Sequence, residues 1–221
     1  MTTTVTEPAA GVITARTAGY AHAAAWILGL AVAWGATPEA GDTYAEITAA
    51  YADRPFRAVA QALLVHGVAA AGLMVVGSGL VDWARRTGST GARQAGWAGW
   101  AGRIAGALAC VQLVLELIAV TGAGPSASGR TGALFEAVQR VDGVKMLALA
   151  ALAAAVCAAS RHGALLRRRE IVLGWVLAAT ITASGIGYLF LSTALTPTAF
   201  LSLPVLLIWI AVLGTALTRR P

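Results

Sequence analysis

Residues 171–218 read IVLGWVLAATITASGIGYLFLSTALTPTAFLSLPVLLIWIAVLGTALT and contain no Asp, Glu, Lys, Arg or His. A helix that crosses the hydrocarbon core of a bilayer needs about 20 mostly apolar residues, so this stretch is long enough for two such helices. Thr193, Thr196 and Pro197 interrupt the apolar run near its middle and favour a turn there. The stretch therefore predicts a membrane hairpin.

Arginines lie at both ends of this hairpin. Residues 167–169 precede it, and residues 219–220 follow it. Because Lys and Arg are enriched in the cytoplasmic loops of membrane proteins, both ends are predicted to face the cytoplasm. Only 12% of the chain is charged, against roughly 25% in ordinary soluble domains, which agrees with an integral membrane protein.

Four further apolar segments precede the hairpin, and the resulting fold class is all-α. We predict a polytopic membrane helix bundle with six transmembrane helices, both termini cytoplasmic, and a single membrane domain over residues 17–218. Residues 1–16 are expected to form a mobile N-terminal tail. The predicted spans are about 17–37, 56–81, 97–121, 134–160, 171–192 and 198–218.

The loop between the first two predicted spans is acidic and is therefore expected outside the cell. Within it, Thr43 and Glu46 have the spacing of a capping box, in which two side chains satisfy the first backbone groups of a helix. Tyr44, Ile47 and Tyr51 would share one face of that helix. We expect an interfacial helix at about 43–53 on the outer surface.

The formal net charge of +6 would suggest a nucleic-acid partner in a soluble protein. Here most arginines fall in or near the predicted inner loops, among them Arg85, Arg86, Arg93 and Arg161. This distribution is the positive-inside bias of a multispanning protein, so we predict no nucleic-acid partner.

No metal and no cofactor is predicted. Cys110 and Cys157 lie in apolar segments without the spacing of a redox or thiolate metal site. Bound haem would need two facing histidines at one depth, whereas His22 is expected near the inner end of its span and His66 in the outer half of the next. Motifs of hydrolases, kinases and zinc proteases are absent from the sequence.

Ionisable side chains inside a span are costly and mark a functional site by default. Glu116, Asp142 and His66 are the three that we predict to carry acid/base chemistry, in the outer halves of the second, third and fourth spans. The side chains expected to bind substrate around them are Gln61, Gln112, Arg57, Gln139, Arg140, Lys145, Tyr44 and Tyr51.

Structural roles for the same residues remain open. Asp142 and Lys145 are spaced i,i+3, and Glu136 and Arg140 are spaced i,i+4, so each pair can neutralise itself along one helix. Glu116 has no such partner on its own helix. It would need Arg57, Arg140 or Lys145 from a neighbour, or it would stay protonated. His66 could be a neutral group that bonds two helices, or it could exchange protons with Glu116 or Asp142.

The layout resembles a broad set of uncharacterised six-helix bacterial membrane proteins of unknown function. The resemblance is carried by Arg103 in the third span and by the basic loop 161–169 that leads into the Ile-Val-Leu-Gly-Trp run at 171–175. In that set the third-helix Arg is often followed by a Glu within one turn. Residues 104–106 here are Ile, Ala and Gly, so no functional residue carries over. The Ala-, Gly- and Arg-rich composition looks actinobacterial and implies the bacterial inner membrane.

These residues favour an integral membrane enzyme or binding protein that acts on a hydrophobic small molecule of the isoprenoid or lipid type. The chemistry would be acid/base catalysis of the cyclase or isomerase type, in an outward-facing polar pocket within the membrane. The alternatives are a small proton-coupled transporter and a non-catalytic accessory subunit of a membrane complex. The expected partners are the lipid bilayer and the small molecule, and assembly into a homo- or hetero-oligomer is open.

Overall fold

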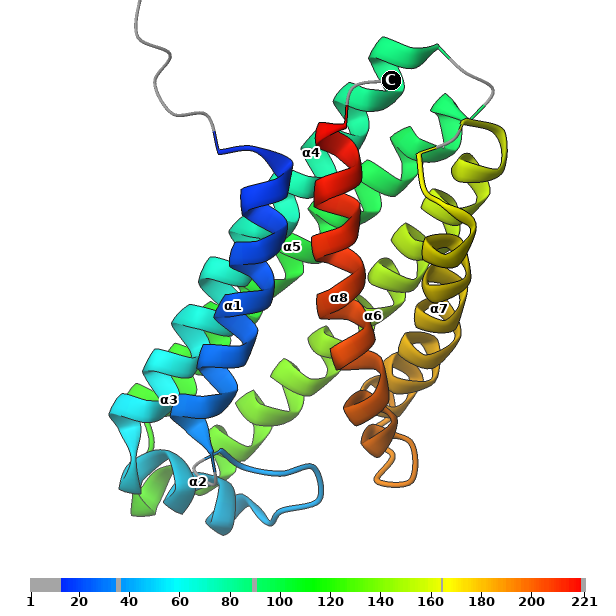
Figure 1. Cartoon of the computed structure of the whole chain (residues 1–221). Helices are drawn as coiled ribbons and strands as arrows, with labels where there is room; N and C mark the ends of the chain where they lie inside the picture. The colour runs from blue at the N-terminus through cyan, green and yellow to red at the C-terminus, as the bar shows by residue number, and fades with distance from the viewer. Residues whose placement is uncertain (1–12, 35–36, 89–90, 164, 220–221) are drawn as a thin grey trace, which may run out of the picture.

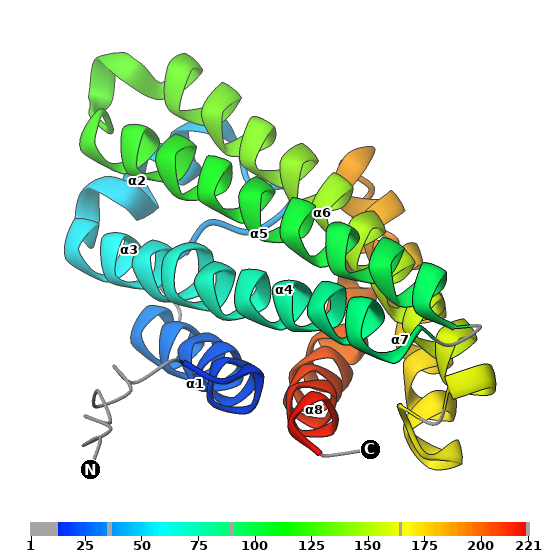
Figure 2. The same cartoon turned by 90° about the horizontal axis from the view of Figure 1, so that it is seen from above.

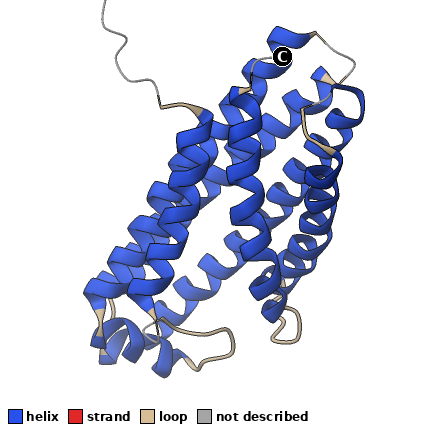
Figure 3. Cartoon of the chain, viewed as in Figure 1, coloured by secondary structure: helices blue, strands red, loops and turns tan. Residues whose placement is uncertain are grey.

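The computed structural model describes residues 13–34, 37–88, 91–163 and 165–219. These residues are helical apart from loops and turns and include no strand (Figure 3), which confirms the all-α class. The predicted tail over 1–16 falls largely outside the described residues. The helices are α1 (Ala15–Ala33), α2 (Tyr44–Asp53), α3 (Pro55–Ala62), η1 (Leu63–Val68), α4 (Ala69–Thr87), α5 (Ala92–Thr121), η2 (Pro125–Ala127), α6 (Ser128–Gly163), α7 (Arg168–Leu189), η3 (Thr196–Thr198) and α8 (Ala199–Thr218).

Five helices within the described ranges are long and apolar enough to cross a membrane. α3, η1 and α4 together count as one of them, because they form a single continuous helix. The remaining long helix, α1, has 19 residues and is not among the five. The five are Pro55–Thr87, Ala92–Thr121, Ser128–Arg161, Arg168–Leu189 and Thr196–Thr218.

Several helices continue beyond the predicted spans. The helix predicted at 56–81 runs to Thr87, and the helix predicted at 134–160 begins at Ser128. Hydropathy marks where apolar side chains stop, whereas backbone hydrogen bonding continues into the polar turns that follow. The first predicted span is too long at its end, because α1 ends at Ala33 and residues 35–36 lie outside the described ranges.

The long helices of the described chain form a ring in chain order (Figure 2). Each of α4, α5, α6, α7 and α8 contacts the next, and α1 contacts both α4 and α8, which closes the ring. α1 begins and α8 ends at the same end of the ring (Figure 1). At that end Ala15 lies against Gly214. There α4 also contacts α8, where a Cβ atom on Gly79 would lie 3.4 Å from Leu217, so the interior that the helices share lies toward the opposite end.

α2 covers the other end of the ring, which we call the α2 end. The predicted capping box is present: the Thr43 backbone N–H donates to Glu46 Oε2 at 2.7 Å, and Thr43 Oγ1 accepts from the Glu46 N–H. The Thr43 hydroxyl also donates to Glu46 Oε2 at 2.7 Å, and the backbone and side-chain hydrogen bonds from Thr43 to this carboxylate lower the pKa of the Glu46 carboxyl. Ile47 and Tyr51 are buried among apolar residues of α3, α5 and α6, so α2 packs onto the helix ends.

Glycines allow neighbouring helices to approach closely. Where α4 meets α5, a Cβ atom on Gly99 would lie 2.6 Å from the Gly77 carbonyl oxygen. Where α6 meets α7, a Cβ atom on Gly143 would lie 2.7 Å from the Gly185 carbonyl oxygen. Small residues at helix interfaces permit such backbone contact in lipid, where packing replaces the hydrophobic effect as the force between helices.

We expect Gly99→Ala to lower the stability of the bundle by about 1–3 kcal/mol, because the new methyl group meets backbone atoms of α4 that cannot yield. The matched control is Gly96→Ala on the same helix, where a Cβ atom meets nothing within 4 Å. Thermal unfolding in detergent measures both. Equal melting temperatures for the two variants would contradict the close approach of α4 and α5.

Candidate functional site

The helix that carries His66 is irregular at that residue. Over Leu63–Val68 it widens into a π-helix, and the Ala69 N–H donates to the Leu64 carbonyl five residues back. Such turns are rare and occur frequently at functional sites. The π-helical turn carries His66 in the wall of the ring interior.

His66 is paired with Glu116 across the interior. His66 Nε2 lies 3.2 Å from Glu116 Oε2, and the two side chains are 12% and 9% exposed. This pair joins the π-helical turn to α5. The partners proposed from the sequence for Glu116, which were Arg57, Arg140 and Lys145, are wrong, because depth along separate helices does not reveal which helix faces which.

A second polar group lies beside this pair and joins α5 to α6. Lys145 is ion-paired with Asp142, as the i,i+3 spacing predicted, and its ammonium donates to Gln112 Oε1 at 2.7 Å. Gln112 Nε2 donates to Asp142 Oδ1 at 2.9 Å and to the Val138 carbonyl at 3.2 Å. Lys145 and Gln112 are almost fully buried, so these hydrogen bonds satisfy groups that water does not reach.

Both polar groups border one cavity of about 260 Å³, which we call the outer compartment. It lies toward the α2 end of the ring. Its polar lining includes Gln61, His66, Gln112, Glu116, Gln139 and Asp142, and its aromatic lining includes Trp26, Tyr51, Phe135, Tyr188 and Phe200. The lining of the compartment therefore combines groups that can exchange protons or hydrogen bonds with aromatic faces.

Three residues predicted to bind substrate lie away from this compartment. Tyr44 is exposed, and its hydroxyl donates to Glu136 Oε1 at 2.7 Å, which raises the pKa of the phenol. Arg140 is also exposed and pairs with Glu136 at 3.3 Å. Arg57 is exposed and lines no described cavity. By contrast, Tyr51 on the same helix as Tyr44 is buried in the compartment wall, and burial raises its pKa.

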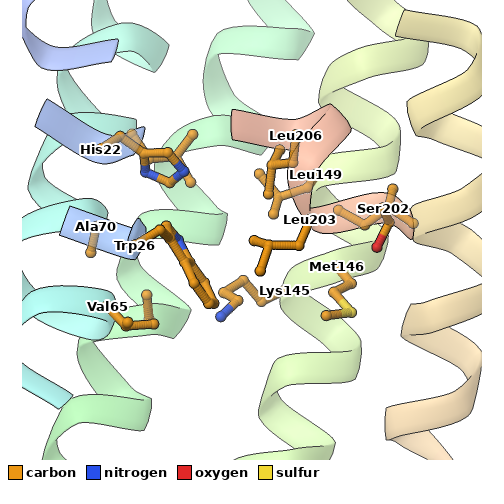
Figure 4. A pocket seen from close by; sticks show the side chains of 13 residues that line it. His22, Trp26, Val65, Ala70, Lys145, Met146, Leu149, Ser202, Leu203 and Leu206 are labelled. Carbon is orange, nitrogen blue, oxygen red and sulfur yellow. The ribbon is translucent and has the colours of Figure 1, made fainter. Parts of the chain in front are cut away.

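A smaller and more apolar cavity of about 40 Å³ adjoins the first one, and we call it the inner compartment (Figure 4). The two compartments share Trp26, Val65, Met146 and Leu203 in their walls. His22 of α1 also lines the inner compartment and is hydrogen-bonded through Nδ1 to the Ala69 carbonyl at 2.8 Å.

Sequence reasoning missed His22 and Trp26 as lining residues. It placed His22 near the inner end of its span. In the structure α1 packs against α4, and this packing brings the His22 imidazole to the carbonyl of Ala69, three residues after His66. The signal in the sequence was a histidine and a tryptophan four residues apart, which share one helix face. The sequence does not indicate that α1 contacts α4, so the position of His22 could not be predicted.

No family model, no curated protein and no solved structure matches the chain.

We expect Lys145→Met to destabilise the bundle by about 3–5 kcal/mol, because it leaves the Asp142 carboxylate buried without its counter-charge. The matched control is Arg140→Met, which breaks an exposed ion pair on the same helix and should cost no more than about 0.5 kcal/mol. Unfolding in detergent measures both. A double variant that also carries Asp142→Asn should recover most of the loss, and a double variant as unstable as Lys145→Met would argue against the charge explanation.

Proposed function

We propose that this chain is a membrane-embedded enzyme or binding protein for a hydrophobic small molecule of the isoprenoid or lipid type. The molecule would occupy the outer compartment and extend into the inner one. The observation that carries the proposal is the His66–Glu116 pair, at 3.2 Å, in the wall of a cavity that is otherwise largely aromatic and aliphatic. A reactive acid/base pair beside apolar walls suits a substrate with few polar atoms.

Charge balance supports a role for this pair in proton transfer. The interior network holds two carboxylates, Glu116 and Asp142, against the single ammonium of Lys145. Lys145 and Gln112 engage Asp142, so Asp142 acts as a fixed counter-ion. The charge of Glu116 is then compensated only when His66 or Glu116 itself holds a further proton. That proton is the one that the pair would give to substrate or take from it.

The aromatic wall supports chemistry of the cyclase or isomerase type. Protonation of a carbon–carbon double bond places positive charge on the substrate, and aromatic faces attract cations. Tyr51, Phe135 and Phe200 line the same compartment as Glu116. Glu116 would donate the proton through its pair with His66, and these rings would stabilise the cation that forms.

We further propose that α1 is a sixth span and that the α2 end faces outward from the bacterial inner membrane. α1 packs along α4 and α8, parallel to helices that are themselves long enough to cross. The α2 end carries Glu39, Asp42 and Glu46 near the start of α2. The opposite end carries most of the arginines, as the positive-inside rule expects of a cytoplasmic face.

Cysteine labelling in intact cells tests this orientation. In a background without Cys110 and Cys157, an impermeant maleimide should label Ala45→Cys on α2. It should label Ile13→Cys and Thr218→Cys only after the cells are permeabilised, since both positions are exposed at the opposite end. Labelling of Ile13→Cys from outside would remove α1 from the list of spans.

The π-helical turn favours a second candidate, a proton-coupled transporter. A helix that is already widened at His66 can rearrange there at less cost than a regular helix. Purified protein in proteoliposomes distinguishes the candidates, because a transporter moves protons across the bilayer together with its substrate. An enzyme of the proposed kind converts its substrate without a proton gradient.

We expect Glu116→Gln to abolish binding or conversion of the small molecule while the bundle stays folded. Wild type and variant would be extracted in lipid nanodiscs, and their co-purifying apolar molecules identified by mass spectrometry. The matched control is Glu136→Gln, which alters a carboxylate of the exposed ion pair on α6 and should leave the bound molecule unchanged. If Glu116→Gln instead melts early, the pair with His66 is structural. An identical set of molecules in all three samples would contradict the proposed site.

A further inference from the structure

The tautomer of His22 is fixed by its hydrogen bond. His22 Nδ1 lies 2.8 Å from the Ala69 carbonyl oxygen, which can only accept, so Nδ1 carries a hydrogen. In the neutral ring Nε2 is then an acceptor with a free lone pair. The side of His22 away from Ala69 therefore offers an acceptor and no donor.

That acceptor is unsatisfied within the described chain. His22 is 3% exposed, and its Nε2 atom is buried without a hydrogen-bond partner among the described residues. The ring lines the inner compartment, close to Trp26 and Lys145 in Figure 4, and most of the remaining wall is aliphatic. A buried acceptor in such a wall is unfavourable unless a donor reaches it from the cavity.

Lys145 does not supply this donor. Its ammonium donates to Gln112, is ion-paired with Asp142 and lies 5.8 Å from the centroid of the Trp26 ring, and no hydrogen bond from it reaches His22 Nε2. Ser202, which also lines the inner compartment, is hydrogen-bonded with Ser184 at 3.1 Å. The two other polar residues of this wall, Lys145 and Ser202, are thus already engaged with other residues.

The outer compartment also holds buried polar atoms without a partner among the described residues, which are His66 Nδ1 and Gln61 Oε1. His66 Nδ1 accepts when the neutral ring donates through Nε2 to the Glu116 carboxylate, and it donates when the pair holds the further proton. Only His22 Nε2 has its role fixed as an acceptor by a hydrogen bond to a carbonyl. His22 bonds to the carbonyl of Ala69, which lies three residues after His66 on the same continuous helix.

We propose that the ligand of the two compartments is an apolar alcohol or phenol, whose hydroxyl group donates a hydrogen bond to His22 Nε2. The inference rests on the proposed function and names the substrate class of the same site. A ketone, an ether or an ester offers only acceptors and would leave Nε2 unpaired. A hydroxyl group satisfies a buried acceptor without bringing a charge into the inner compartment, and it adds fewer polar atoms to an apolar ligand than an amide does.

Two isomeric probes test the inference. Para-ethylphenol and para-methylanisole have the same molecular formula, but only the phenol has a hydroxyl hydrogen to donate. Their affinities for wild-type protein in nanodiscs would be measured by titration and corrected for partition into the lipid. We expect the phenol to bind at least about tenfold more tightly, because the ether leaves a buried acceptor unpaired.

Nitrogen NMR of protein labelled at histidine gives an independent readout on wild type. The chain contains three histidines, and His22→Gln identifies the His22 signals by their loss. We expect the Nε2 resonance of His22 to shift on addition of the phenol and to stay in place with the ether. This measurement holds even if a variant at position 22 folds poorly.

Variants locate the preference. His22→Phe keeps a ring in the wall without an acceptor and should bind both probes equally, whereas His22→Gln can still bond to Ala69 and accept from the ligand and should keep part of the preference. The inference is overturned if His22→Phe retains the full preference for the phenol over the ether. It is also overturned if wild type binds both probes equally, as it would if His22 held only a water molecule. In both cases the proposed function stands. If neither probe binds wild type, both fail.

Discussion

The buried ammonium of Lys145 is the constraint on which the rest of the site depends. A charged group in an apolar bundle must be compensated, and here Asp142 supplies the charge while Gln112 supplies a carbonyl oxygen. Because Gln112 belongs to α5 and the other two residues to α6, the helices cannot slide past one another without breaking this group. Glu116, one turn further along α5, is thereby held opposite the π-helical turn and meets His66.

The network also explains why the interior contains compartments. Polar side chains that bond to one another along α5 and α6 do not fill the centre of the ring as leucines would. Leu149 and Leu206 line the inner compartment and also belong to the closely packed aliphatic core, so they mark where that core begins. α2 covers the end of this space with Tyr51, while Trp26 lies between the two compartments. The result is a lumen that changes from charged to apolar over a short depth, which suits a molecule that is mostly apolar.

Much of the fold could be predicted from the sequence, because its signals are local. The hairpin at 171–218, the other apolar segments and the capping box of Thr43 and Glu46 all depend on residues near one another in the chain. The Asp142–Lys145 pair was predicted for the same reason. The partner of Glu116 and the position of His22 were not, because each depends on which helices touch. A periodic pattern of small and apolar residues on every helix does not specify neighbours.

The π-helical turn at Leu63–Val68 behaves as a one-residue insertion in a helix that is otherwise regular. One residue of an α-helix corresponds to about 100° of rotation about the helix axis. The insertion therefore sets the direction of the side chains before the turn relative to those after it. Gln61 precedes the turn and Ala69 follows it, yet Gln61 and the histidine bonded to Ala69 both border the lumen. Removing a single residue from this turn would rotate the side chains before it and direct Gln61 toward a neighbouring helix or lipid. The other residues that line the lumen would stay the same.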